Sequence, residues 1–153
     1  MLKRFRFSVL VLSVFIFSCE NGAKDPYSQF EFAPSSDQLT LPDQFAVVVV
    51  VDSTGVGRHL AVRENGDIYV HTRSKTDDGH GMVALRDENQ DGKADIKEYF
   101  NPFPGTGIEI HKNYLYFSNT NRIFRTPFIG DALLPSAEMD TIAHLLGGKG
   151  GHV

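Results

Sequence analysis

The stretch DENQDGKADIKE, residues 87–98, places oxygen-bearing side chains at the spacing of a calcium-binding loop. Counted from its first acid, such a loop takes side-chain ligands from positions one, three, five, nine and twelve, a carbonyl from position seven, and a sharp turn from a glycine at position six. A hard divalent cation prefers such a shell of oxygens, so the sequence predicts a calcium site. The expected side-chain ligands are Asp87, Asn89, Asp91, Asp95 and Glu98. Lys93 is the expected carbonyl ligand, and Gly92 is the expected turn residue.

The predicted calcium loop is not an EF-hand, because its flanks have the pattern of strands and its eighth position holds Ala94. We therefore expect Glu98 to face away from the ion and Asp95 to complete the shell. A shell filled by carboxylates has no open position for a substrate, so the expected role is structural. The alternative interpretation is a solvated acidic turn without an ion.

The common catalytic motifs are absent from the sequence. It contains no HExxH zinc motif, no GxSxG motif, no Walker loop, and no GxGxxG between a strand and a helix. His59, His71 and His111 stand near expected strand ends and are interpreted as surface or hydrogen-bonded structural residues, and His80 as a loop residue. The glycine-rich residues 147–151 are interpreted as a flexible connection.

Short strands are predicted on both sides of the acidic loop. Asn65-Gly66 separates an alternating run from the apolar residues 68–70, which is a strong hairpin signal. Residues 82–85 and 96–100 add two more strands, and residues 108–126 repeat the hairpin layout. Each repeat supplies about four strands with a period of about 45 residues, which is typical of a propeller blade. Because no stretch has sustained helical periodicity, the predicted fold class is all-β.

Five consecutive valines, residues 47–51, precede the first hairpin. Valine is β-branched and favours strands, and this run is too continuous for a strand with one solvent-exposed face. The sequence therefore predicts a buried strand that is covered on both faces.

The N-terminal residues have the three-part layout of an export signal. Three cations in the first six residues precede the apolar run SVLVLSVFIF, which is shorter than the about 20 residues of a membrane span. Ser18-Cys19 then resembles the lipobox of bacterial lipoproteins, from which Phe17 departs. Cys19 is the single cysteine of the chain and cannot form an internal disulfide. We expect a signal peptide over residues 1–18 and lipid attachment at Cys19, the alternative being an ordinary cleaved signal with an incidental cysteine.

Residues 19–43 mix Pro, Ser, Asn and Asp without a period and are interpreted as a flexible tether, which leaves residues 44–153 as the domain. Loss of residues 1–18 removes three of the 15 Lys and Arg and none of the 19 Asp and Glu, so the formal charge changes from −4 to −7. An acidic domain is not expected to bind nucleic acid. The expected location is exported and lipid-anchored to a bacterial membrane, on its periplasmic or cell-surface side.

Four pieces of the chain resemble the start of the glucose/sorbosone dehydrogenase family of quinoprotein sugar dehydrogenases. The resemblance spans residues 44–153 and implies part of a six-bladed β-propeller that binds pyrroloquinoline quinone (PQQ). It also implies oxidation of a sugar or related alcohol by hydride transfer to the quinone, with His152 as the base that takes the hydroxyl proton. The alternative for His152 is a terminal residue without a catalytic role. The four pieces are FAVVVVVDSTGVGRHLAVRENGDIYV, LRDENQDGKADIKEYF, GTGIEIHKNYLYFSNTNRIFR and LLGGKGGHV.

The sequence stops at Val153, before the Gly-Asp hairpins and basic residues with which that family holds the quinone carboxylates. We therefore expect an N-terminal fragment, about two blades and a preceding strand, that is inactive as written. A second reading is a lipid-anchored calcium-binding propeller module without catalysis, because integrin-like and adhesin propellers also place DxNxDGxxD loops between strands. A third reading is a scaffold lipoprotein that binds partners on its propeller face.

Overall fold

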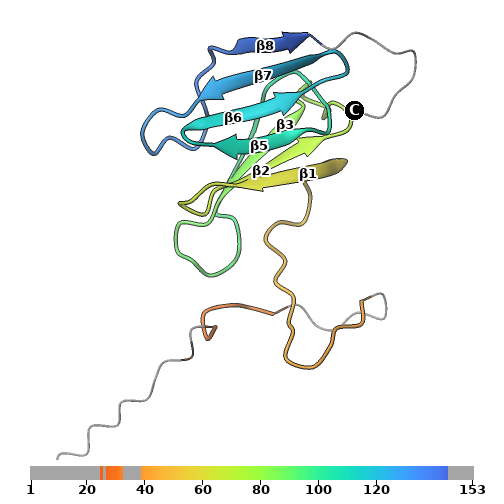
Figure 1. Ribbon diagram of the computed structural model, residues 1–153. Helices are drawn as coiled ribbons and strands as arrows, with labels where there is room; N and C mark the ends of the chain where they lie inside the picture. Colours follow the sequence, from red (N-terminus) through yellow and green to blue (C-terminus); the bar gives the residue numbers. More distant parts are fainter. Residues whose placement is uncertain (1–24, 26, 33–38, 145–153) are drawn as a thin grey trace, which may run out of the picture.

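The computed structural model describes residues 25, 27–32 and 39–144 of the 153-residue chain. The expected signal peptide, Cys19 and His152 lie outside these residues. The described residues form two four-stranded antiparallel sheets and no helix, so the all-β prediction is confirmed. In both sheets the strands follow one another in chain order (Figure 1).

The first sheet contains the hairpin expected at Asn65-Gly66 and the two strands expected on either side of the acidic loop. Val62 pairs with Ile68 across the Asn65-Gly66 turn, and Gly66 takes the left-handed φ of 94° that such a turn requires. The strands are β1 (Gly57–Val62), β2 (Ile68–Thr72), β3 (Met82–Arg86) and β4 (Ile96–Phe100).

The second sheet repeats this meander, and its first strand lies beside the first strand of the other sheet (Figure 1). The strands are β5 (Ile108–His111), β6 (Tyr114–Ser118), β7 (Arg122–Pro127) and β8 (Asp140–His144).

One hydrophobic core joins the two sheets. Alternation along β2 and β3 directs Tyr69 and Met82 toward the second sheet, where they contribute to the same buried cluster as Phe117 and Phe124. The rings of Phe117 and Phe124 stack with centroids 5.1 Å apart. The other members of the cluster are Ala84, Leu115, Phe128 and Leu133.

The strand predicted for the valines at 47–51 is wrong. This run has no regular secondary structure, and Val49 is 44% exposed. Val50 and Val51 pack against the opposite face of the first sheet, and the carbonyl of Val50 accepts a hydrogen bond from the amide of Ala94 at 2.8 Å. β-Branched residues favour a strand only where a partner strand completes the ladder, and no strand of the described residues pairs with this run.

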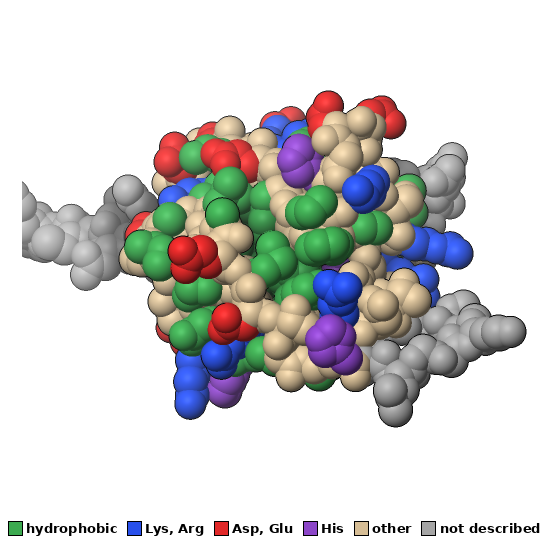
Figure 2. All heavy atoms as spheres, turned by 90° about the horizontal axis from the view of Figure 1, so that it is seen from above, with side chains coloured by type: hydrophobic (Ala, Val, Ile, Leu, Met, Phe, Trp, Pro, Cys, Tyr) green, Lys and Arg blue, Asp and Glu red, His purple; other side chains and the backbone are tan. Residues whose placement is uncertain are grey.

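The molecule exposes apolar side chains at the β8 end of the second sheet. Figure 2 looks down on this end and shows hydrophobic side chains spread over the visible face, with charged groups around them. Met139 and Ile142, just before and within β8, are 39% and 46% exposed. In the part of the chain that the structure describes, β8 pairs with β7 alone.

Candidate functional site

The acidic loop begins directly after β3 and turns its carboxylates toward its own backbone. Asp87 accepts hydrogen bonds from the amide of Gln90 at 2.7 Å and from the amide of Gly92 at 2.8 Å. Asp91 accepts one from the amide of Lys93, also at 2.8 Å. These short bonds within the loop give it a defined shape, because each carboxylate oxygen involved fixes a backbone amide two to five residues further along the chain.

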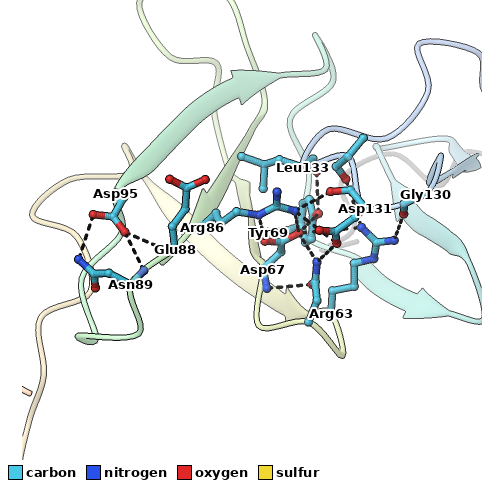
Figure 3. A network of polar contacts seen from close by, with 12 residues as sticks. Arg63, Asp67, Tyr69, Arg86, Glu88, Asn89, Asp95, Gly130, Asp131 and Leu133 are labelled. Carbon is cyan, nitrogen blue, oxygen red and sulfur yellow. Dashed lines mark hydrogen bonds and ion pairs between the residues drawn. The ribbon is translucent and has the colours of Figure 1, made fainter. Parts of the chain in front are cut away.

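Asp95 connects the end of the loop to its beginning. Its carboxylate accepts a hydrogen bond from the amide of Glu88 at 2.8 Å, and its amide donates to the carbonyl of Arg86 at 2.9 Å. Figure 3 shows Asp95 directed at Glu88 and Asn89. Glu98 lies apart from these contacts, as an exposed residue of β4 opposite Ala84.

The expected calcium ligands are therefore near one another in the chain, but their oxygens are bonded to loop amides. Among the residues that the structure describes, no three acidic, histidine or cysteine side chains form a group that could hold a metal ion. A bound calcium would have to replace amide donors at Asp87, Asp91 and Asp95 or share the carboxylates with them. Calcium binding stays a prediction.

A segment from the expected tether covers one side of the loop. The ammonium of Lys93 donates to the carboxylate of Glu31, and this bond raises the pKa of Lys93 and lowers the pKa of Glu31. A groove of about 410 Å³ lies between the loop, this segment and the valine run. Its lining residues are Glu31, Phe32, Val49, Val50, Val51, Asp52, Lys93 and Ala94.

A second polar group, which the sequence analysis missed, is centred on Asp67. This carboxylate is 1% exposed and receives two charged hydrogen bonds from Arg86, at 2.6 Å from Nε and 2.7 Å from Nη2. The β2–β3 register explains the pairing: Ile68 lies opposite Leu85, so Asp67 lies opposite Arg86. Burial alone raises the pKa of Asp67, but the hydrogen bonds from Arg86 and Asn65 together keep it below its usual value.

The Asp67 group also fastens the first sheet to the second (Figure 3). Arg86 donates to the carbonyl of Asp131 at 2.9 Å, and Arg63 donates to the carbonyl of Gly130 at 2.6 Å. The hydroxyl of Tyr69 donates to the carbonyl of Leu133 at 2.7 Å, and its burial raises the pKa of that hydroxyl. Because residues 128–139 connect β7 to β8, these bonds act as a structural lock between the sheets.

Two histidines hold the connection between β4 and β5. His71 is completely buried, and its two ring nitrogens lie 3.0 Å from the carbonyl of Gly107 and 3.1 Å from that of Phe103. Its neighbour His59 lies 2.6 Å from the carbonyl of Thr106. Burial lowers the pKa of His71, and the two carbonyls oppose that change only in part. The structural interpretation of these histidines is confirmed, as is the loop position of His80.

The described residues do not offer a site that fits PQQ, which carries three carboxylates. Such a group needs converging cations, and of three pockets one has no charged residue at all. Each of the other two is lined by side chains of both charges. Lys93 lines one pocket together with Glu31 and Asp52. Arg63 and Lys112 line the other together with Glu64 and Asp131.

Comparison with protein-family models, curated proteins and solved structures finds no match for this chain. In the described ranges, no helix is long and apolar enough to span a membrane. The fold and the site therefore define an all-β protein with an acidic loop and a buried ionic lock.

Proposed function

We propose that this chain forms the first two blades of a β-propeller that oxidises a sugar or related alcohol with PQQ as the electron acceptor. The observation that carries the proposal is the pair of consecutive four-stranded meanders in which β1 lies beside β5. A propeller repeats such a sheet around an axis. The quoted stretches that resemble the glucose/sorbosone dehydrogenases run through both sheets.

The open end of the second sheet supports the same proposal. β8 exposes Ile142, and Met139 beside it is also exposed. A further blade packed face to face on the second sheet would cover exposed apolar side chains of this kind. In this proposal the hydroxyl proton of the substrate goes to His152, which lies outside the described residues.

The test is dye-coupled oxidation of aldoses in the presence of PQQ and calcium. It compares the 153-residue chain with a product extended by the codons that follow residue 153 in its gene. We expect PQQ-dependent activity from the extended product and a loss of at least about a hundredfold in His152→Ala. His111→Ala, an exposed histidine on β5, is the matched control and should retain activity. Extended product that reduces no dye with any aldose would contradict the proposal.

A second function, which is compatible with the first, is structural calcium binding by residues 87–98. The observation in its favour is that Asp87, Asp91 and Asp95 point into one short loop, whereas the nearby cation Lys93 is paired outward with Glu31. Calcium would neutralise this charge. Isothermal titration with calcium tests the site, and the absence of heat would remove it. If the protein binds calcium at this site but has no dehydrogenase activity, its function is that of the calcium-binding module without catalysis.

The proposed export and lipid attachment have an independent test. Cys19→Ser should move the protein from the membrane fraction to the soluble fraction, because Cys19 is the only cysteine available for a lipid. Unchanged sedimentation of the variant would contradict attachment at this residue.

A further inference from the structure

The acidic loop is in contact with a segment that precedes the folded sheets by more than twenty residues. Residues 27–32 lie across it, and Phe30 is the one residue of this segment that is not exposed. A Cβ placed on Gly92 would come within 2.7 Å of Cδ1 of Phe30 and within 2.8 Å of Cγ1 of Val48. The ring of Phe30 therefore occupies space that only a glycine at position 92 leaves open.

The shape of residues 27–32 is fixed by local contacts. The amide of Phe30 donates to the carbonyl of Tyr27 at 3.0 Å, and the amide of Tyr27 donates to the carboxylate of Asp25 at 2.9 Å. The ring of Phe30 lies 6.1 Å from that of Tyr27 and 6.3 Å from that of Phe32, measured between centroids. The segment thus presents a turn with Phe30 at its point of contact.

The segment contacts the loop at the two positions that also shape the expected ion site. Phe30 meets Gly92, the turn residue at position six, and Glu31 pairs with Lys93, whose carbonyl is the expected ligand at position seven. The amide of Lys93 is bonded to Asp91, another expected ligand. Movement of this segment away from the loop would therefore free the Gly92 turn from its contact with Phe30 and the Lys93 side chain from its pair with Glu31.

We propose that residues 27–32 form a strap that closes on Gly92 and Lys93, and that strap closure and calcium binding in the loop reinforce each other. This inference rests on the proposed calcium site. Linkage makes the effect reciprocal: calcium protects the strap from opening, and the closed strap raises the affinity for calcium. Because the strap lies between Cys19 and the first sheet, its closure also sets how far the domain extends from a lipid at that residue.

Limited proteolysis of the unmodified chain is the first test. Chymotrypsin cleaves after the aromatic residues 27, 30 and 32, and we expect millimolar calcium to slow these cuts several-fold relative to a chelator. Cleavage within the folded sheets, for example after the partly buried Tyr116 of β6, reports general stability and serves as the internal comparison. Equal strap cleavage with and without calcium, in protein that binds calcium by calorimetry, would overturn the coupling and leave the calcium site intact.

Calorimetry on variants measures the other half of the linkage. Phe30→Ala and Glu31→Gln should each weaken calcium binding, with about a fivefold increase in Kd for Phe30→Ala. Gln29→Ala is the matched control, because Gln29 is an exposed residue of the same strap, and its Kd should equal that of the unmodified protein. The same Kd in Phe30→Ala and Gln29→Ala would overturn the strap. Absence of calcium heat in the unmodified chain would instead remove the proposed site itself and the coupling with it.

Discussion

Two groups of charged residues, which meet at the peptide bond between Arg86 and Asp87, use their carboxylates in opposite ways. Asp67 is buried and holds Arg86, the last residue of β3, through two charged hydrogen bonds. Asp87 follows immediately and gives its oxygens to loop amides. Figure 3 places the two groups side by side, with Asp95 and its partners on one side and the arginine cluster on the other.

The difference concerns charge compensation. At Asp67 a guanidinium supplies the opposite charge, so this site is complete without any added ion. Backbone amides satisfy the hydrogen bonds of Asp87, Asp91 and Asp95 but do not cancel their charge. The first group is therefore expected to maintain the fold, and the second to respond to a cation.

The largest effect is expected from breaking the buried pair. Asp67→Asn leaves the Arg86 charge without its partner and should lower the free energy of unfolding by about 3 kcal/mol. The control is Asp140→Asn, which breaks the exposed pair with Arg125 and should not change stability measurably. Denaturant unfolding of the two variants measures both values. Equal stability of Asp67→Asn and the unmodified protein would show that Asp67 is not a lock.

A smaller effect is expected in the acidic loop from Gly92→Ala. Gly92 and Gly66 have φ values of 90° and 94°, so alanine at either position costs about 1 kcal/mol through backbone strain. A Cβ at Gly66 meets nothing within 4 Å, whereas one at Gly92 meets Phe30 and Val48. Gly92→Ala should therefore be destabilising by at least about 1 kcal/mol more than Gly66→Ala in chelator. An equal loss of stability in the two variants would show that the contact between Phe30 and Gly92 does not contribute to the free energy of unfolding.

His71 is expected to make the stability of the protein depend on pH. Because burial lowers the pKa of His71 in the folded protein, the unfolded chain takes up this proton first as the pH falls below 6.5. The stability present above pH 6.5 should decrease between that pH and the lower folded pKa. Urea unfolding at several pH values should give a flatter curve for His71→Gln than for the unmodified protein. An identical slope in both would contradict a buried, neutral His71.

The sequence predicted the parts of the fold that depend on neighbouring residues. Asn65-Gly66 specifies a local turn between two runs of strand-forming residues, so the hairpin of β1 and β2 was located correctly. The valine run at 47–51 was misassigned, because a strand also requires a partner that local propensity does not supply.

The sequence likewise located only part of the candidate site. Spacing alone located the acidic loop, because its contacts are made within nine residues. The Asp67–Arg86 pair was missed because it depends on the β2–β3 register, although an acid before one strand and an arginine at the end of the next is a usable signal. The contact between Phe30 and Gly92 crosses more than sixty residues and has no local signal.

Thermal unfolding with and without calcium tests the central distinction most directly. The experiment compares the unmodified chain with Asp91→Asn, which keeps an oxygen acceptor for the amide of Lys93 but removes one charge. We predict that calcium at a hundred times its Kd stabilises the unmodified protein by about 2.7 kcal/mol and raises its Tm, with a much smaller rise in Asp91→Asn. An unmodified protein whose Tm is the same in millimolar calcium and in chelator would contradict the account, because the acidic loop would then be as complete without a cation as Asp67 is with Arg86.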